Sequence, residues 1–215
     1  QQIYHQKQTI GSFDFIYQHQ GTLIHRESAV KFYLGVPKPQ PEACEAFGSS
    51  NLSQWWGPNK LDRLDLKLKK LTQHQICLSE SPVAQSFLQT QGLQIQRREI
   101  DLKGYLFYPW QQRLAAPEGT HPNHLRGYWL TLSQFEAFNA DTYWWVLPRM
   151  SWLSKAKLKR DEQPIPHPEL KTQIETMMMQ QASPSLLAKM HKLGEYWIET
   201  ERFFVVPSGW ENINA

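Results

Sequence analysis

Three residues in the first part of the chain have side chains that could act together on a phosphate ester. Asp14 and Glu27 carry carboxylates, which are the oxygen ligands that Mg²⁺ prefers, and Lys31 carries an ammonium group that can steady developing negative charge. Glu27 and Lys31 are four residues apart, so they share one face if their segment is a strand. The simpler alternative is a solvated face with a cross-strand salt bridge, which contributes only ~0.2–1 kcal/mol.

Two strands joined by a short turn are predicted to position these residues. Residues 9–17 and 23–34 are rich in Phe, Ile, Tyr and Val, which favour strands. The turn is His19-Gln20-Gly21-Thr22, whose Gly can take a left-handed conformation. Asp14 on the first strand is then expected to face Glu27 and Lys31 across an antiparallel pair.

This arrangement resembles the PD-(D/E)XK nuclease-like superfamily, in which an Asp on one strand and a Glu-x-Lys on the next hold a divalent metal and a water. Further stretches, over about residues 9–153, resemble an uncharacterised bacterial family, a domain of unknown function, within that superfamily. These stretches are Gly11-Ser12-Phe13-Asp14-Phe15, Glu27-Ser28-Ala29-Val30-Lys31-Phe32-Tyr33-Leu34-Gly35, Trp56-Gly57-Pro58-Asn59, Asp62-Arg63-Leu64-Asp65, Lys103-Gly104-Tyr105-Leu106-Phe107-Tyr108-Pro109, His124-Leu125-Arg126-Gly127-Tyr128-Trp129 and Leu147-Pro148-Arg149.

The resemblance implies a metal-dependent nuclease-like enzyme that cleaves phosphodiesters. Asp14 and Glu27 would hold Mg²⁺ (or Mn²⁺), and Lys31 would orient the attacking water. Two departures favour an alternative, a catalytically inactive module that binds nucleic acid or a partner protein. Ala29 stands where the superfamily has its Glu, and the eight residues before Thr9 contain no acid, so a leading segment is expected to be missing.

The order of the remaining elements predicts the fold class and the domains. Alternating strands and helices indicate an α/β (α+β) fold, and the resemblance implies a restriction-endonuclease-like mixed sheet flanked by helices. Residues 1–153 are expected to form this domain, followed by a basic, Pro-rich linker at residues 154–168. Residues 169–215 are expected to form a C-terminal helical extension packed on the same domain, because Leu and Met recur there at helical spacing.

Four cations are candidates for contact with the phosphates of DNA or RNA. Three of them, Lys60, Arg63 and Lys67, belong with Lys70 to a basic stripe on a helix predicted over residues 60–75, with Asn59 as its N-cap. Arg126 lies in a strand predicted over residues 124–130, where an Arg is costly unless it is paired or faces a site. The alternatives are a solvated helix face for the stripe and a carboxylate partner for Arg126.

Composition excludes several classes of protein. The chain has 215 residues, 13% of them aromatic, so it is long and aromatic enough to fold around a core. Its net charge of +3 allows nucleic-acid binding without requiring it. Two cysteines, Cys44 and Cys77, indicate a cytoplasmic protein with reduced thiols, and no apolar run approaches the ~18 residues of a membrane span. His121 and His124 are not expected to bind a metal, because Pro122 lies between them and no third ligand is near.

Overall fold

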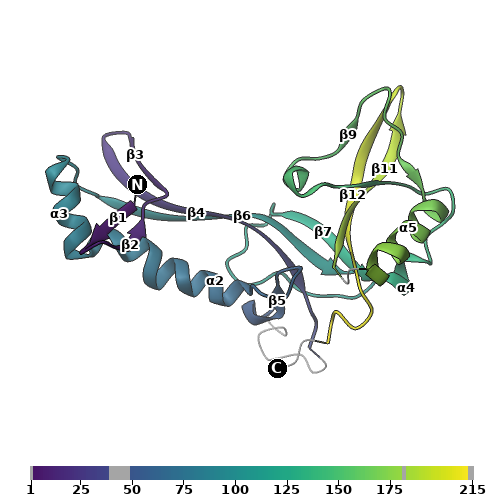
Figure 1. The fold of residues 1–215 in the computed structure, drawn as a ribbon, viewed down its shortest axis with the longest axis horizontal. Coiled ribbons are helices and arrows are strands. Elements are labelled where there is room, and N and C mark those ends of the chain that lie inside the picture. The colour runs from purple at the N-terminus through teal and green to yellow at the C-terminus, as the bar shows by residue number, and fades with distance from the viewer. Residues whose placement is uncertain (1, 39–48, 181–182, 213–215) are drawn as a thin grey trace. The chain divides into compact units, whose positions relative to one another are not determined.

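The computed structural model describes residues 2–38, 49–180 and 183–212, which form two compact units (Figure 1). Unit 1 comprises residues 1–31 and 64–103, and unit 2 comprises residues 32–63 and 104–215. A 10-stranded mixed sheet has the strand order β10-β8-β11-β12-β7-β6-β4-β3, with β5 paired to β4 and β9 paired to β12. Its two long strands, β4 (Thr22–Gly35) and β6 (Arg97–Pro109), have residues in both units. The mixed α+β sheet predicted from the sequence is therefore confirmed.

Unit 1 contains the predicted hairpin. Strand β3 (Phe15–His19) pairs antiparallel with β4, and the turn between them is Gln20-Gly21, where both residues have positive φ angles of 49° and 79°. This two-residue turn matches the right-handed twist of the strands it joins. The remaining elements of unit 1 are β1 (Gln2–His5), β2 (Gln8–Ser12), α2 (Leu64–Lys70), a π-helix (Leu71–Gln75), a 3₁₀-helix (Ile76–Glu80) and α3 (Pro82–Thr90).

The first predicted strand, residues 9–17, is divided in the structure. Strand β2 ends at Ser12 and pairs with β1, and β3 starts at Phe15, so Asp14 lies at a bend between two strands. The division has a packing cause: Phe13, which precedes the bend, is 3% exposed and belongs to a core cluster with residues of β1 and α3. The placement of Asp14 within a strand was wrong, whereas its position opposite β4 was not.

Helix α2 begins later than the sequence predicts. Residues 57–63 form a turn in which the Gly57 N–H donates to the Asp62 carbonyl, and Lys60 has a positive φ of 60°. The Asn59 side chain accepts from the N–H of Leu61, which is a local turn bond rather than a helix cap. Leu61, which lies in this turn, is 87% exposed. Lys60 and Arg63 therefore precede the helix, and only Lys67 lies on it.

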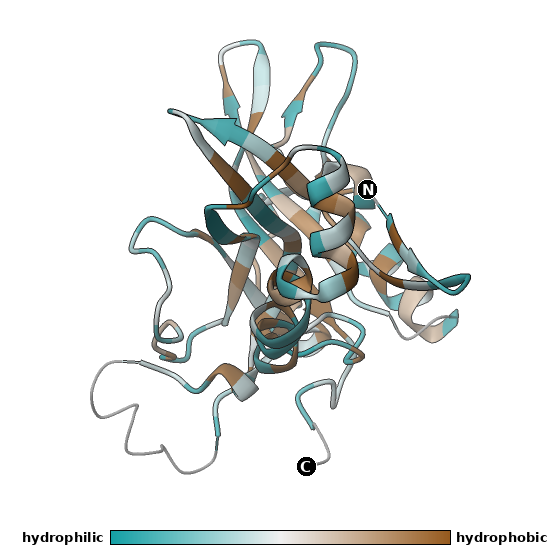
Figure 2. Cartoon of the chain, turned by 90° about the vertical axis from the view of Figure 1, so that its left-hand side faces the viewer, coloured by the Kyte–Doolittle hydropathy of each residue, from teal (hydrophilic) through white to brown (hydrophobic). Residues whose placement is uncertain are grey.

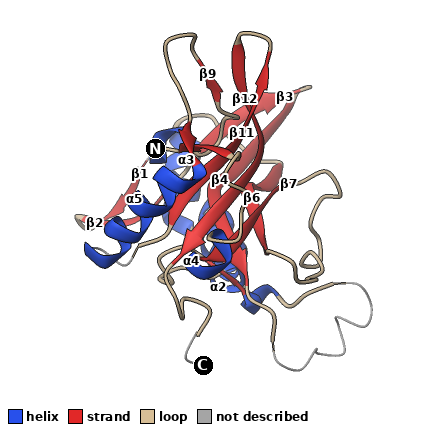
Figure 3. Cartoon of the chain, turned by 90° about the vertical axis from the view of Figure 1, so that its right-hand side faces the viewer, coloured by secondary structure: helices blue, strands red, loops and turns tan. Residues whose placement is uncertain are grey.

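Unit 2 is built on a run of strands covered by two helices on one side (Figures 1 and 3). Besides β4 and β6 its strands are β5 (Trp55–Trp56), β7 (Leu125–Thr131), β8 (Tyr143–Val146), β9 (Lys157–Leu158), β10 (Ile165–Pro166), β11 (Ser185–Leu193) and β12 (Tyr196–Val206). Its helices are α4 (Leu132–Phe135) and α5 (His167–Gln180), with 3₁₀ turns at Leu52–Gln54 and Arg149–Ser151. In Figure 2 hydrophobic residues lie on both strands and helices, while the loops are mostly hydrophilic.

The C-terminal part is not the predicted helical extension. Residues 185–193 form β11, which pairs with β12 and with β8, and the chain continues as strand β12 (Figure 3). Gly194, with a φ of 61°, lies in the turn of the β-hairpin that β11 and β12 form. Leu186 and Leu187 are both buried, on opposite faces of a sheet that is covered on two sides. A strand buried on both faces has consecutive apolar residues instead of alternating ones, so its sequence resembles that of a buried helix. Residues of the expected linker also enter the sheet, as β9 and β10.

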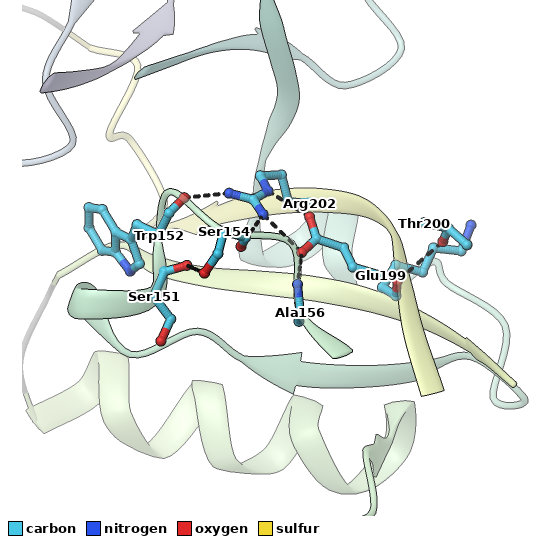
Figure 4. Close-up of polar contacts among 8 residues, drawn as sticks. Ser151, Trp152, Ser154, Ala156, Glu199, Thr200 and Arg202 are labelled. Atoms are coloured by element: carbon cyan, nitrogen blue, oxygen red, sulfur yellow. Dashed lines mark hydrogen bonds and ion pairs between the residues drawn. The ribbon is translucent and has the colours of Figure 1, made fainter. Parts of the chain in front are cut away.

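A buried ion pair fixes the loop before β9 to β12 (Figure 4). Arg202 is 2% exposed, and its guanidinium donates to both carboxylate oxygens of Glu199, at 2.6 and 2.8 Å. The same guanidinium donates to the carbonyls of Trp152 and Ser154, and Glu199 also accepts from the N–H of Ala156. Every polar group of this cluster is thus satisfied within the protein, which is the condition for a buried charge to be tolerated.

Candidate functional site

The structure brings two of the three predicted catalytic residues together. The backbone N–H of Asp14 lies 3.4 Å from Oε1 of Glu27, and Oδ2 of Asp14 accepts from the N–H of Ser28 at 3.0 Å. The Asp14 side chain is exposed, whereas Glu27 has no exposed surface. Lys31 lies four residues beyond Glu27 on β4, about 13 Å along an extended strand. Asp14 and Glu27 are therefore neighbours linked through backbone N–H groups, with the Asp14 side chain exposed and the Glu27 side chain buried.

Glu27 is held by two side chains that the sequence analysis did not single out. His25 Nε2 lies 2.9 Å from Glu27 Oε1, and Gln75 Nε2 donates to Oε2 at 3.0 Å. Because a carboxylate only accepts, His25 carries its proton on Nε2, and its Nδ1 can accept from the Ser79 hydroxyl at 3.2 Å. Lys67 donates to Oε1 of Gln75 at 3.2 Å, which turns the Gln75 amide group toward Glu27.

The position of Gln75 depends on the π-helical turn at Leu71–Gln75. A π-helix changes the direction in which the following side chains point, so no 3.6-residue pattern could have placed Gln75 beside β4. His25 had a readable signal, because it lies two residues before Glu27 on the same strand face. His25 is 0% exposed and packs edge-on against Phe13, with ring centroids 4.7 Å apart. The chain Ser79–His25–Glu27 is therefore enclosed in the core of unit 1.

Unit 1 also contains an open pocket of about 740 Å³. Its charged lining includes Arg97, Arg98 and Glu80. Arg98 pairs with Glu80 and Arg97 pairs with Glu99, both at 2.6 Å, so these cations are balanced by carboxylates. The bonds from Arg26 and Tyr17 hold the pKa of Glu99 down to about 2, which keeps it charged at neutral pH. The pocket thus has no excess of positive charge for a phosphate.

The four predicted phosphate-binding cations are divided between the units. Lys67 belongs to unit 1 and bonds Gln75, as described above. The other three belong to unit 2, and each lies over an aromatic ring: Lys60 over Trp210 at 5.6 Å, Arg63 over Trp56 at 5.1 Å and Arg126 over Tyr108 at 4.2 Å. The single basic stripe of the sequence analysis was wrong, because Lys60 and Arg63 do not lie on α2.

Arg126 is part of a polar cluster with Tyr108 and His124. The Tyr108 hydroxyl lies 2.8 Å from Nε2 of His124, and Nδ1 of His124 lies 2.8 Å from the carbonyl oxygen of His121. Burial raises the pKa of the Tyr108 phenol, and the Arg126 guanidinium acts in the opposite direction. Arg126 is exposed, and no carboxylate partner is found for it within the described parts of the chain. The expected alternative of a carboxylate partner is thus not realised there.

No metal cluster is evident in residues 2–38, 49–180 and 183–212: they contain no group of three or more His, Cys, Asp or Glu side chains that could hold an ion. In the same ranges no helix is long and apolar enough to cross a membrane.

Comparison with known protein families identifies the family of this chain. A family model matches residues 1–206, which is nearly the whole chain. The chain therefore belongs to the family described as Domain of unknown function (DUF1853). A comparison with curated proteins and one with solved structures both gave no match.

Proposed function

We propose that this chain binds nucleic acid through the cation–aromatic pairs of unit 2, and that it is a nuclease-like fold whose Asp14–Glu27 pair acts in structure rather than in metal-dependent cleavage. The observation that carries the proposal is the environment of Arg126. This guanidinium is exposed, has no carboxylate partner among the described residues, and is steadied over the Tyr108 ring at 4.2 Å. An Arg in this state keeps its donors available for phosphate oxygens.

The rings beside Lys60 and Arg63 support the same proposal. Aromatic faces next to cations are the usual combination in proteins that bind single strands, because bases stack on the rings while the cations contact the backbone. Stacking on Trp56 also restricts the Arg63 side chain, which lowers the entropy lost when it meets a ligand. The net charge of +3 is consistent with modest, salt-sensitive affinity.

The donor set around Glu27 does not fit Mg²⁺ as it stands. A hard cation needs carboxylate oxygens with free lone pairs and room for several waters. Both oxygens of Glu27 already accept bonds from His25 and Gln75, and the residue has no exposed surface. Asp14 alone is accessible, and one exposed carboxylate is a weak site. The metal-dependent route stays a prediction, which a calorimetric titration with Mg²⁺ and Mn²⁺ at millimolar concentration would test.

Nucleic-acid binding is best tested by fluorescence anisotropy with labelled single-stranded and double-stranded oligonucleotides over a range of salt concentrations. Removing one phosphate contact should lower the slope of log K against log salt by about 0.7 for a single strand and about 0.9 for a duplex, which corresponds to roughly five- to eightfold weaker binding at ~0.1 M salt. We expect this loss for Arg126→Ala. The matched control is Arg160→Ala, because Arg160 is also an exposed cation of unit 2 but pairs with Glu195.

The proposal predicts that, of these two variants, only Arg126→Ala loses affinity for the oligonucleotide. Equal weakening by Arg160→Ala would indicate nonspecific attraction to net charge, and an unchanged salt slope for Arg126→Ala would remove Arg126 from the interface. Wild-type protein that binds no oligonucleotide at low salt would overturn the proposed function as a whole.

A further inference from the structure

The cluster of Tyr108, His124 and Arg126 has the geometry of an activated nucleophile. We infer that Tyr108 attacks a phosphodiester of bound nucleic acid and forms a covalent phosphotyrosyl bond, with His124 as the base and Arg126 as the group that stabilises charge on the phosphate. The inference rests on the proposed nucleic-acid binding and adds a chemical step to it. It requires three things of the structure: a base within reach of the phenol, a fixed orientation of that base, and a cation at the reacting oxygen.

The base is within hydrogen-bond reach of the nucleophile. The distance from the Tyr108 hydroxyl oxygen to His124 Nε2 is 2.8 Å, which is close to the usual length of such a bond. The phenol needs this base, because a Tyr hydroxyl of ordinary pKa, about 10, is protonated at neutral pH, and burial raises the pKa of Tyr108 further.

The orientation of His124 is fixed from its other side. Nδ1 lies 2.8 Å from the carbonyl oxygen of His121, and a carbonyl can only accept, so Nδ1 carries the proton of the neutral ring. Nε2 is then the unprotonated nitrogen, and the Tyr108 hydroxyl donates to it. A second contact holds the His121–His124 turn, because the N–H of His124 donates to the same carbonyl at 3.0 Å. The nucleophile, the base and the acceptor that orients the base thus form one chain of hydrogen bonds.

The cation is supplied from the neighbouring strand. Strands β6 and β7 pair in parallel with Leu106 opposite Arg126 and Tyr108 opposite Tyr128, so Arg126 is diagonal to Tyr108. Its guanidinium carbon lies 4.2 Å from the centroid of the Tyr108 ring. A phosphate bound by Arg126 would therefore arrive beside the phenol, and negative charge that develops on the phosphate oxygens would be stabilised by the guanidinium.

Access to Tyr108 depends on the same residues. Tyr108 is 5% exposed, with Trp55 packed edge-on against its ring at 5.1 Å. Of the two groups beside its polar end, Arg126 is exposed and His124 is half-buried. A long Arg side chain can swing toward a phosphate and uncover the hydroxyl without any change in the strands, as expected of a site that closes only around its ligand.

The reaction can be written with its atoms and charges balanced. The phenol oxygen of Tyr108 attacks phosphorus while its proton passes to Nε2 of His124. The bond from phosphorus to one bridging oxygen breaks, and that oxygen leaves with the bonding electron pair and takes a proton from water. His124 returns its extra proton to the solvent. The products are a phosphotyrosyl diester and a strand that ends in a free hydroxyl.

The test uses the full chain and a labelled single-stranded oligonucleotide containing a bridging phosphorothiolate, whose sulfur leaves without needing a proton. We expect a covalent protein–oligonucleotide band on a denaturing gel, and a nucleotide-modified Tyr108 in the mass spectrum of its peptide. Tyr108→Phe should abolish the adduct while keeping the oligonucleotide affinity within about twofold of wild type. Tyr128→Phe, which alters the paired position on β7, should leave the adduct yield unchanged.

His124 and Arg126 have separate signatures. For an all-oxygen substrate, His124→Ala should slow adduct formation by about 10²–10⁴-fold, and added imidazole should restore part of the rate, which a purely structural role of His124 would not allow. Arg126→Lys should slow it by about 10²–10³-fold with a smaller change in affinity. Binding without any adduct, or an adduct at a residue other than Tyr108, would overturn the inference and leave the proposed binding intact. Absence of binding would instead overturn the proposed function.

Discussion

The buried pair of Arg202 and Glu199 gives the sharpest test of how unit 2 is held together. Replacing Arg202 with Met keeps an unbranched apolar stem but removes all four hydrogen bonds that the guanidinium donates. Glu199, 7% exposed, would keep only the N–H of Ala156, and the carbonyls of Trp152 and Ser154 would lose their donor. Removing one partner of a buried, hydrogen-bonded ion pair typically costs about 3–5 kcal/mol.

That loss should be measurable by two independent methods. In urea it appears as a lower midpoint with an unchanged m-value, because the surface exposed on unfolding stays the same. For a chain of this size, ~2–4 °C of melting temperature are lost per kcal/mol, so Arg202→Met should unfold roughly 6–20 °C below wild type. The control is Arg160→Met at the exposed pair with Glu195, where the two side chains are 70% and 66% exposed and the expected change is within about 0.5 kcal/mol.

A double variant separates the two contributions. Arg202→Met together with Glu199→Met removes both charges, so most of the lost stability should return, because no unpaired charge is left in the interior. A single variant that loses under 1 kcal/mol, or a double variant less stable than Arg202→Met alone, would refute the argument from burial.

Three further predictions follow from the same reasoning. Burial, with a smaller effect from Lys171, lowers the pKa of His167 in the folded chain. The contribution of neutral His167 to stability is therefore complete above its unfolded pKa of about 6.5 and falls as the pH drops below that value. In His167→Phe the melting temperature should depend less on pH between about pH 6.5 and 5 than it does in the wild type. Glu99 has its pKa lowered to about 2, chiefly by Arg26, so its contribution is present above about pH 4.5 and is lost on acidification toward 2; Glu99→Gln should be less acid-sensitive in the same melting assay. A Cβ on Gly127 would lie 2.5 Å from the ring of Phe107, so Gly127→Ala should lower the free energy of unfolding in urea by ~1–3 kcal/mol, and an unaffected midpoint would contradict this packing.

Local pattern was sufficient for the hairpin but not for the C-terminal strands. In β4 alternation, turn chemistry and the final pairing all agree, so the strand expected at residues 23–34 is close to the observed Thr22–Gly35, whereas the strand expected at residues 9–17 is divided into β2 and β3. In β11 the run of Leu, Ala and Met suits a helix, and only pairing with β8 and β12 decides otherwise. Tertiary pairing of this kind cannot be read from a segment alone.

The candidate sites show the same limit at the level of single side chains. Asp14 and Glu27 could be brought together from the sequence because one turn fixes their register. The hydrogen bond from Gln75 occupies one oxygen of Glu27 and so bears on whether Glu27 can bind a metal. Its geometry depends on a π-helix, which has no recognisable pattern in the sequence. Tyr108 and His124 are brought together by the parallel pairing of β6 and β7. The sequence of neither segment indicates that the two strands pair.

The division of the units along the chain has a consequence for synthesis. Unit 1 is complete once residue 103 has been made, but unit 2 must wait for β11 and β12, which begin at Ser185. Residues 32–63 therefore emerge long before the strands of unit 2 that follow residue 103. Apolar segments whose pairing strands have not yet been synthesised are prone to aggregate and are typical substrates of chaperones. A ribosome stalled near residue 150 would carry one finished unit and one unfinished sheet, so folding on the ribosome should proceed in two stages in the order of synthesis.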